Sequence, residues 1–254
     1  MTRIILSGAG GKMGKVICAL ASETDDVEIV CGFDISKFES SFPIYENPFD
    51  FTGDADVIID FSHPSAFEGL VKYAYERKLP LIMCTTGLSG AQKAALSELS
   101  AEIPVFFSAN MSLGVNLLTT LARKAASVLY GNFDIEIVER HHNRKIDAPS
   151  GTALAIADAI NDVIPDEAEY VYDRHAQRRR RSRQEIGIHA VRGGNIVGDH
   201  TVIFAGKDEV IELSHHAASK EIFAAGALRA AVFMHNKPAG MYDMDMLIHS
   251  ETGL

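Results

Sequence analysis

The first half of the chain alternates short apolar runs with longer segments in which apolar residues recur at helical spacing. The nearly continuous apolar runs are residues 3–7, 27–33, 57–60, 81–84 and 105–108. The helical segments between them are residues 12–22, 65–77 and 90–101. Strands that are apolar on both faces and separated by helices are typical of a parallel sheet covered on both sides. The pattern therefore predicts an α/β domain built on a parallel sheet.

The pattern changes near residue 111. A helical segment, residues 113–129, leads into residues 133–137, where apolar and polar positions alternate strictly. Such alternation indicates a strand with one face more exposed to solvent, as in an open or antiparallel sheet. A helix from residue 152 to about residue 164 is expected next, and glycine-containing turns then separate three strand candidates, residues 186–192, 201–205 and 210–215. This part is predicted to be an α+β domain with a mostly antiparallel sheet.

The tail is helical again over residues 219–234 and ends in the segment 237–244. We expect this tail to return to the first domain. The predicted domains are therefore residues 1–111 with 220–254, and residues 112–219.

Composition and charge narrow the classes of function. The 254 residues carry a formal net charge of −10, and an acidic surface repels nucleic acid and anionic membranes, so neither is an expected partner. No apolar run approaches the roughly 18 residues of a membrane span, and the apolar start is too short for a signal peptide. The three cysteines are scattered, which fits a reducing compartment and offers no disulfide framework and no zinc spacing. We expect a soluble cytoplasmic protein with no metal site.

One segment departs from the acidic average, the arginine-rich run at residues 178–183. A basic run can bind RNA or a phosphorylated partner. In an acidic chain it is more often a solvated loop, here between a helix and a strand.

The turn after the first predicted strand is rich in glycine, with the order Gly8-Ala9-Gly10-Gly11-Lys12-Met13-Gly14. Glycines permit a tight turn and a close backbone approach to a pyrophosphate, which sits on the N-terminus of the following helix. Asp34 ends the second strand, where a carboxylate can accept hydrogen bonds from ribose hydroxyls. A plain turn and a surface aspartate are the alternative. The strand–turn–helix context favours a Rossmann-like dinucleotide site.

Two further loops end strands on the ligand side of such a sheet, Cys84-Thr85-Thr86-Gly87 and Ser108-Ala109-Asn110-Met111. We expect them to line the path of the nicotinamide ribose. Ile35 follows Asp34, so no arginine stands there to meet a 2′-phosphate. NADH should then bind at least as well as NADPH, although Lys12 and Lys37 are close enough in sequence to weaken the bias.

The most informative segment is residues 138–153, which holds a histidine pair, a lysine, an aspartate and a Pro-Ser-Gly-Thr helix start. The first N–H groups of a helix are unpaired, and the helix dipole favours negative charge there. A lone histidine pair is usually surface or core filling. Proton donors placed directly before an anion-binding helix start indicate an active site.

These residues resemble the dihydrodipicolinate reductase family, also called 4-hydroxy-tetrahydrodipicolinate reductases, of the diaminopimelate route to lysine. Residues 139–153 are similar to the family signature Glu-x-His-His-x-x-Lys-x-Asp-Ala-Pro-Ser-Gly-Thr-Ala. The resemblance extends over nearly the whole chain, with supporting segments at residues 8–14, 84–87, 108–116, 188–194 and 237–244.

The resemblance implies roles for individual residues. His141 is the general acid/base, Lys145 the proton donor and His142 a substrate contact, while Gly151 and Thr152 bind a substrate carboxylate. The cofactor, NADH or NADPH, is bound by Gly8, Ala9, Gly10, Gly11, Lys12, Met13, Asp34, Cys84, Thr85, Thr86, Ser108, Ala109, Asn110 and Met111. A small dicarboxylate substrate and a homotetramer built through the sheet of the second domain are also implied.

The sequence departs from the family pattern at two positions. Some members carry arginine where Ile35 stands, which puts the cofactor preference in doubt. Many members have glycine where Cys84 stands, which leaves the predicted fold intact.

The chemistry of the expected reaction supports this assignment independently of the resemblance. Hydride transfer to a conjugated cyclic imine leaves negative charge that a proton must quench, and histidine can donate near neutral pH. A charged lysine suits both carboxylate attraction and proton donation. Other candidates are another two-domain NAD(P)-dependent dehydrogenase, a dinucleotide-sensing regulator and an RNA-binding protein. The signature after residue 138 argues against the first, the presence of His141 and Lys145 against the second, and the acidic total against the third.

Overall fold

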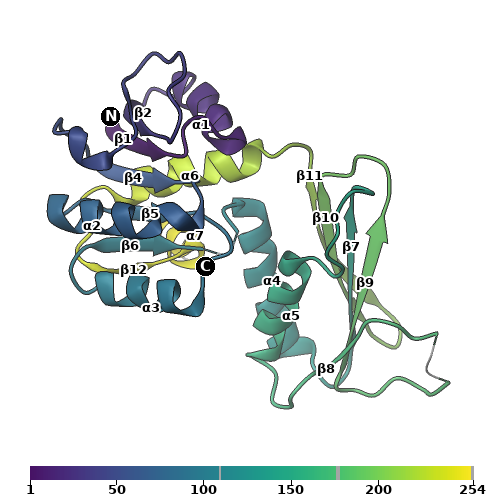
Figure 1. Cartoon of the computed structure of the whole chain (residues 1–254). Coiled ribbons are helices and arrows are strands. Elements are labelled where there is room, and N and C mark those ends of the chain that lie inside the picture. The colour runs from purple at the N-terminus through teal and green to yellow at the C-terminus, as the bar shows by residue number, and fades with distance from the viewer. Residues whose placement is uncertain (109, 176–177, 253–254) are drawn as a thin grey trace. The chain divides into compact units, whose positions relative to one another are not determined.

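The structure is a computed structural model that describes residues 1–108, 110–175 and 178–252. The chain forms two compact units, which are coloured along the chain in Figure 1. The first unit comprises Met1–Leu113 and Glu221–Leu254, and the second comprises Gly114–Lys220.

Within its described residues, the first unit holds a seven-stranded sheet in the order β12-β6-β5-β4-β1-β2-β3. Its strands are β1 (Thr2–Ser7), β2 (Val27–Phe33), β3 (Ile44–Tyr45), β4 (Val57–Asp60), β5 (Leu81–Met83), β6 (Pro104–Phe107) and β12 (Gly240–Tyr242). Every neighbouring pair is parallel, which confirms the predicted parallel sheet. The tail returns to this sheet, because β12 pairs with β6.

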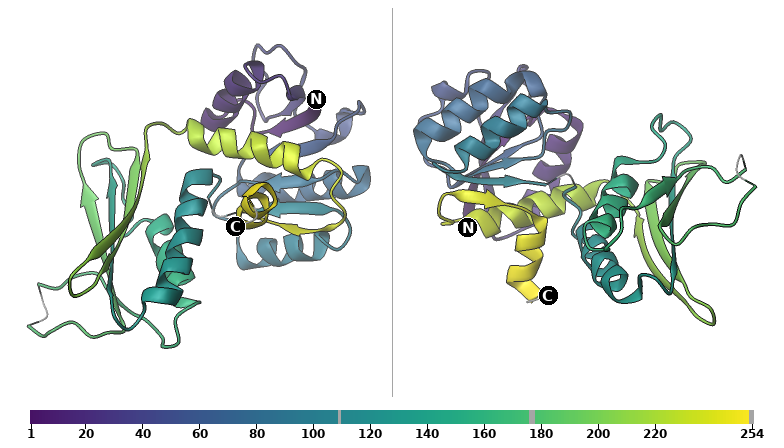
Figure 2. Two further views of the ribbon diagram at one scale, coloured as in Figure 1. Left: turned by 180° about the vertical axis from the view of Figure 1, so that it is seen from behind. Right: turned by 90° about the horizontal axis from the view of Figure 1, so that it is seen from below.

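Helices cover both faces of this sheet, as two views of the ribbon show (Figure 2). One face packs against α1 (Lys12–Ser22), α6 (Glu221–Met234) and α7 (Met244–Thr252), and the other against α2 (Phe67–Arg77) and α3 (Gly90–Leu99). In β1, Ile4 and Leu6 belong to the first of these cores and Ile5 to the second. Successive side chains of a strand point to opposite faces, so double coverage requires the continuous apolar runs seen in the sequence.

The strand order reverses between β1 and β4. The chain runs outward through β2 and β3 on one side, and through β5 and β6 on the other. In open α/β sheets, ligands bind outside the carboxyl ends of the strands at this switch point. The glycine-rich turn that follows β1 lies there.

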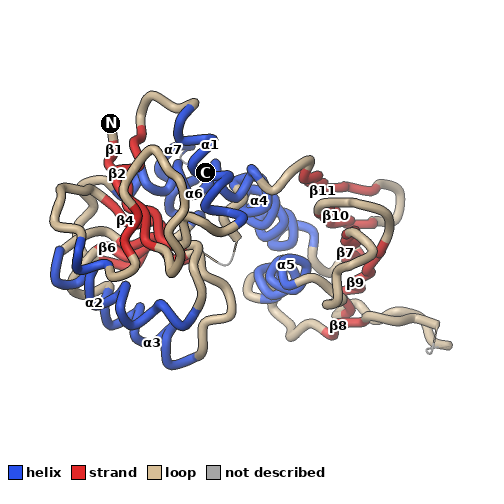
Figure 3. The backbone as a smooth tube through the Cα atoms, turned by 45° about the horizontal axis from the view of Figure 1, so that its top comes forward, coloured by secondary structure: helices blue, strands red, loops and turns tan. Residues whose placement is uncertain are grey.

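The second unit packs two helices on one face of a five-stranded sheet, seen in the tube view of Figure 3. Its described elements are α4 (Leu113–Leu129), β7 (Asp134–His141), α5 (Gly151–Asn161), β8 (Glu169–Val171), β9 (Glu185–Arg192), β10 (Gly198–Ala205) and β11 (Val210–Ala217). Leu118 of α4 and Ile156 of α5 pack with Ile137 and Val202 of the sheet. The predicted combination of a parallel-sheet domain with an α+β domain is confirmed.

The second sheet is mixed, which corrects the expectation of a mostly antiparallel sheet. Strand β10 is antiparallel to both β11 and β7, whereas β9 is parallel to both β7 and β8. The chain leaves the end of β7, passes through α5 and re-enters the sheet in the same direction. A crossover of this kind is what parallel neighbours require.

The arginine-rich run lies between β8 and β9, and several of its side chains pair within the unit. Arg179 forms an ion pair with Glu169 at 2.6 Å. Arg181 pairs with Asp134 and donates to the backbone carbonyl groups of Ile135 and Glu185. These contacts tie the run to the first residues of β7, β8 and β9. Among the described helices, none is long and apolar enough to cross a membrane.

Candidate active site

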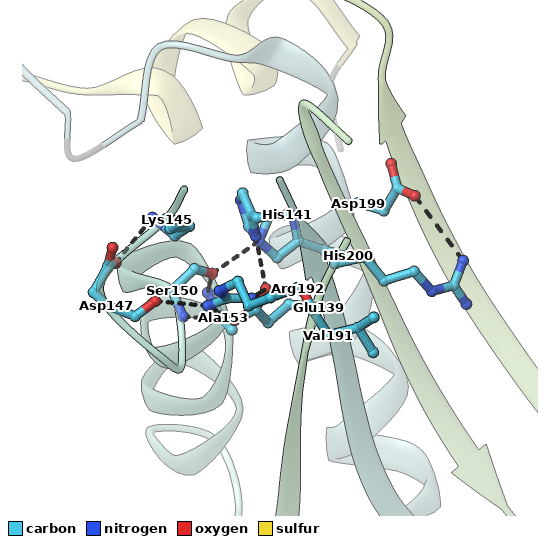
Figure 4. A network of polar contacts seen from close by, with 11 residues as sticks. Glu139, His141, Lys145, Asp147, Ser150, Ala153, Val191, Arg192, Asp199 and His200 are labelled. Atoms are coloured by element: carbon cyan, nitrogen blue, oxygen red, sulfur yellow. Dashed lines mark hydrogen bonds and ion pairs between the residues drawn. The ribbon is translucent and has the colours of Figure 1, made fainter. Parts of the chain in front are cut away.

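His141 ends β7, and its ring is held by the carboxylate of Glu139 two residues earlier on the same strand. The Nδ1 atom of His141 lies 2.6 Å from Oε2 of Glu139 (Figure 4). Residues two apart on a strand point to the same face, so the strand itself brings the two side chains together. The Glu139 side chain is 0% exposed.

The carboxylate of Glu139 collects two further partners from distant parts of the sequence. Arg192, at the end of β9, donates from both terminal nitrogens, one to each carboxylate oxygen, at 2.7 Å. The backbone N–H of Ser150 donates to Oε1 at 3.0 Å. The first cause acting on the pKa of Glu139 is burial, which raises it, but the hydrogen bonds from Arg192, His141 and Ser150 outweigh burial and lower it.

The loop after β7 carries the predicted proton donor. Lys145 forms an ion pair with Asp147, with 2.9 Å between Nζ and Oδ2, and this contact lowers the pKa of Asp147. The N–H of Lys145 donates to the carbonyl of His142, which makes a turn. The loop is also tied to the β9–β10 connection, because Asn143 N–H donates to the carbonyl of Gly194. His142 is partly buried, and no described group pairs with its Nδ1 atom.

Helix α5 begins as the sequence predicted. Ser150 is the N-cap, and its hydroxyl accepts a hydrogen bond from the N–H of Ala153 at 3.1 Å. Gly151 is exposed, and a Cβ atom added to it would meet nothing within 4 Å. The start of the helix next to Gly151 is therefore open to a ligand, and its dipole favours an anion.

A buried histidine that the sequence reading did not single out completes this cluster. His200 of β10 lies 3.1 Å from the Ser150 hydroxyl through Nε2, and its ring meets the ring of His141 edge to face. Burial, followed by the charge of His141, lowers the pKa of His200 to about 4. His200 is therefore neutral at physiological pH.

The glycine-rich turn of the first unit has the geometry that a dinucleotide requires. A Cβ atom on Gly8 would lie 2.5 Å from the carbonyl oxygen of Phe61, and one on Gly14 would lie 2.3 Å from that of Gly8. Only glycine fits such close approaches of backbone to backbone. The N-cap of helix α1 is Gly11, and no side chain makes a capping hydrogen bond there. This cradle at a helix start fits a pyrophosphate.

Asp34 lies against the same turn, as the ribose assignment requires. Its Oδ2 atom accepts from the N–H of Gly10 at 2.8 Å, and its Oδ1 atom accepts from the N–H of Ser36 at 3.1 Å. Ile35 beside it is 88% exposed. The carboxylate thus stands at the carboxyl end of β2 with a solvent-exposed apolar neighbour and no adjacent arginine. Lys12 and Lys37 are both exposed.

The loop after β5 is anchored by Asp60, a buried carboxylate at the end of β4. Asp60 accepts a hydrogen bond from the hydroxyl of Thr85 at 2.6 Å and one from the N–H of Ser62 at 3.2 Å. Its backbone carbonyl accepts from Cys84 N–H. Thr85 is buried in this contact and Thr86 is exposed, so the two threonines present different surfaces to a ligand.

Not every residue of the predicted cofactor set exposes its side chain. Ala9, Cys84 and Met111 are buried in the core of the first unit, so only their backbone groups are open to a ligand role. The hydroxyl of Ser108 donates to the carbonyl of Asn110 at 2.9 Å. Ala109 lies outside the described residues. No group of three or more metal-binding side chains occurs in the described part of the chain.

The chain matches two family models, "Dihydrodipicolinate reductase, N-terminus" over residues 2–111 and "Dihydrodipicolinate reductase, C-terminus" over residues 114–248. The chain belongs to the dihydrodipicolinate reductase family. Members of this family are oxidoreductases that use a nicotinamide cofactor. The expectation drawn from residues 139–153 is therefore confirmed at the level of the family.

Individual relatives support this placement. A 4-hydroxy-tetrahydrodipicolinate reductase of Caldanaerobacter subterraneus subsp. tengcongensis is 54% identical over 248 residues, which cover 98% of each chain. One of Clostridium tetani is 49% identical over 251 residues, also 98% of each chain. The structure of a dipicolinate-bound dihydrodipicolinate reductase from Paenisporosarcina sp. TG-14 aligns with a TM-score of 0.83 at 23% identity. That alignment covers 96% of this chain and 97% of the other, and it supports the fold.

Sequence reasoning missed the partners of the reductase signature. Arg192 lies in the segment 188–194 that supported the family resemblance, but no role was predicted for it. His200, on β10, lies in none of the segments that the sequence analysis singled out. Asp60 carried a weak signal, because a carboxylate that ends an apolar strand of a parallel sheet faces the ligand edge. Glu139 was part of the signature, but nothing in the sequence indicated that it would be fully buried.

Proposed function

We propose that the protein reduces 4-hydroxy-tetrahydrodipicolinate to tetrahydrodipicolinate in the diaminopimelate route to lysine, with NADH or NADPH as the reductant. The observation that carries this proposal is the cluster of His141, buried Glu139, Lys145 and the open start of α5 in one unit. Family membership supports the same reaction. The reaction consumes the reduced nicotinamide and one proton, and it releases the oxidised nicotinamide and water.

His141 is the proposed general acid. Its Nδ1 atom is engaged by Glu139, which leaves Nε2 to exchange a proton with substrate. Loss of the 4-hydroxyl group with a ring hydrogen, as water, leaves a conjugated imine. A bound nicotinamide would supply the hydride to this ring, and the proton would quench the negative charge that the transfer leaves.

Lys145 is the proposed proton donor beside His141, and it also attracts the carboxylates of the substrate. Its ammonium group pairs with Asp147 in this structure, and the Lys145 side chain is 22% exposed. An incoming substrate carboxylate competes with Asp147 for the same hydrogen-bond donors. His142 is proposed to contact the substrate from the same loop.

The start of α5 is the proposed site of one substrate carboxylate. The N–H groups of Gly151 and Thr152 belong to the first turn, next to the N-cap Ser150. A crystal structure with pyridine-2,6-dicarboxylate tests this assignment. One carboxylate should lie within hydrogen-bond distance of these N–H groups, and a carboxylate beyond reach of both would contradict the assignment.

The proposed cofactor site is the turn from Gly8 to Met13, with Asp34 holding the ribose and the loops at residues 84–86 and 108–111 lining the nicotinamide side. We propose that both cofactors are used, with a bias toward NADH. Asp34 repels a 2′-phosphate, and exposed Ile35 offers no cation to compensate. Lys12 and Lys37 keep the bias small.

We also propose a homotetramer assembled through the sheet of the second unit. Ile188 of β9 belongs to the core, so Val191, three residues further along the strand, points to the opposite face. Phe204 of β10 belongs to the core and pairs with Ile211 of β11, so Val210 also points to the opposite face. Val191 and Val210 are 44% and 58% exposed, as expected for residues at an interface between copies. Light scattering after gel filtration should give four times the monomer mass. A monomer at micromolar concentration would contradict this proposal.

A coupled assay tests the proposed reaction. The preceding synthase makes the substrate from pyruvate and aspartate semialdehyde, and the loss of reduced nicotinamide is followed by absorbance with each cofactor. Turnover is expected with both. Folded protein that binds cofactor and shows no turnover would refute the assignment.

A further inference from the structure

Glu139 sits at the junction of three segments that come from separate parts of the second unit. Its Oε2 atom accepts from His141 and from Arg192, and its Oε1 atom accepts from Arg192 and from the N–H of Ser150 (Figure 4). All four contacts are 2.6 to 3.0 Å long. The side chain is completely buried, so no exposed surface remains through which it could touch a ligand directly.

The partners of Glu139 define its charge. Arg192 stays protonated at any physiological pH and presents a planar fork that matches a carboxylate. The hydrogen bonds from Arg192, His141 and Ser150 outweigh burial and hold the pKa of Glu139 below its ordinary value. Glu139 is therefore ionised and acts only as an acceptor.

An ionised Glu139 determines which nitrogen of His141 carries hydrogen. Because the carboxylate cannot donate, Nδ1 of His141 must donate to it, and Nε2 is the atom left to exchange a proton. The space beside Nε2 is bounded by Gly198, where an added Cβ atom would lie 3.1 Å away. The ring also packs edge to face against His200. These contacts thus fix both the orientation of the His141 ring and the nitrogen that donates to Glu139.

The same carboxylate also anchors the start of helix α5. Ser150 is its N-cap, and the N–H that precedes the helix donates to Oε1 of Glu139. One side chain thereby ties the histidine ring and the helix start to a common point. A substrate held by its carboxylate at the helix start would meet Nε2 at a fixed separation, which is the condition for efficient proton transfer.

We propose that Glu139, held by Arg192, is a positioning residue that presents Nε2 of His141 to the substrate and sets its distance from the anion site. This inference rests on the proposed function, in which His141 is the acid. The competing explanation is that Glu139 serves only the fold, as a buried ion pair whose loss destabilises the unit.

Strand β7 carries a partly exposed counterpart of this arrangement on its other face. Glu136 lies 2.7 Å from Nε2 of His189 and 3.3 Å from Arg181, which repeats the glutamate–histidine–arginine arrangement away from the loop that carries Lys145. Glu136 is 23% exposed whereas Glu139 is fully buried, so a purely structural role predicts that any loss of turnover in either variant follows its own loss of Tm. A positioning role predicts a loss of turnover for Glu139 alone.

The experiment compares Glu139→Gln, Glu139→Asp and Glu136→Gln in kcat, KM, Tm and the ¹⁵N shifts of His141. Glu139→Gln should lower kcat roughly 10²-fold, the scale of a misdirected general acid, with KM changed only a few-fold. Its amide can donate to Nδ1, so the ¹⁵N spectrum should show the proton moving toward Nε2. Glu139→Asp keeps the charge beside Arg192 and should lose turnover with a smaller loss of Tm. Glu136→Gln should keep wild-type kcat.

Three results would overturn the inference. One is a folded Glu139→Gln variant with wild-type kcat, and another is an unchanged His141 tautomer in that variant. The third applies if Glu139→Gln does not fold, and it is an activity loss in Glu139→Asp that only follows its loss of Tm. These outcomes differ from a failure of the proposed function, which would appear as no turnover by the wild type or as full turnover by His141→Gln. The tautomer measurement requires no substrate.

Discussion

The rings of His141 and His200 meet edge to face, with their centroids 5.3 Å apart and their planes at 74°. His200 is 4% exposed, and its pKa falls to about 4 through burial, with the charge of His141 as the next cause. Glu139, His215 and Asp199 contribute smaller effects of both signs. A neutral histidine therefore packs against the proposed acid and hydrogen-bonds to the cap of α5.

This contact predicts how stability depends on pH. A histidine whose folded pKa lies below its unfolded pKa of 6.5 contributes stability above pH 6.5 and loses it as pH falls to about 4. The size is about 3 kcal/mol, from the difference between the two pKa values. His200→Gln should flatten the dependence of the urea midpoint on pH between 6.5 and 4. Equal slopes for the variant and the wild type would exclude His200 as the cause.

His141 and Lys145 should matter more to turnover than to folding. Lys145 lies in the loop after β7, and glutamine in place of His141 keeps a polar side chain that can hydrogen-bond to Glu139. His141→Gln and Lys145→Ala should each lower kcat roughly 10²-fold or more, with Tm close to wild type. Arg144→Ala is the control, because Arg144 is an exposed residue of the same loop whose guanidinium donates a hydrogen bond to Asn195. A Tm collapse that matches the activity loss would speak for a structural role.

Glycine at position 198 should be required to leave space beside Nε2 of His141. An alanine Cβ atom at this position would lie 3.1 Å from Nε2 and would press on the atom proposed to exchange the proton. Gly198→Ala should lower kcat by roughly tenfold or more, because small displacements of a catalytic group are costly. Gly69→Ala is the matched control, since its added Cβ atom meets nothing within 4 Å. Full activity in Gly198→Ala would show that Nε2 needs no such space.

Asp34 should discriminate between the two cofactors. Removing its charge in Asp34→Ala should shift the ratio of specificity constants toward NADPH, by roughly tenfold or less, since an exposed charge pair is worth about 1 kcal/mol. Both cofactors should bind more weakly, because Asp34 also accepts from Gly10 N–H. Ile35→Arg should shift the ratio the same way, with Ile35→Ala as its control. The prediction would be contradicted by a wild type that strongly favours NADPH, or by an Asp34→Ala variant with an unchanged ratio. Lys12 and Lys37 would then be the next residues to substitute.

The ionised carboxylate of Asp60 should lower the free energy of unfolding at neutral pH. Burial raises its pKa, and the hydrogen bonds from Ser62 and Thr85 offset this only in part. An acid with a raised folded pKa contributes stability below its unfolded pKa of 3.8 and loses it as pH rises through the folded pKa. Asp60→Asn keeps an acceptor for Thr85 and should therefore raise Tm at pH 7, with the gain shrinking toward pH 4. A lower Tm at pH 7 would mean that the hydrogen bonds need the charge.

The sequence by itself determined the elements and the local chemistry of the sites. Periodicity predicted the parallel sheet of the first unit, because double coverage forces apolar side chains onto both faces of a strand. The glycines at residues 8 to 14 and the cap at Ser150 are local requirements of a tight turn and a helix start. Such features depend on a few consecutive residues, so they can be read before folding is known.

Only the tertiary structure decided which distant groups meet. The mixed order of the second sheet depends on where the chain re-enters after α5, and alternation along one strand carries no record of its neighbour's direction. Arg192 reaches Glu139 across a sequence separation of 53 residues, and Thr85 reaches Asp60 across 25. Burial and charge pairing are properties of the packed chain, so the carboxylates that orient the sites became visible only after their surroundings were in place.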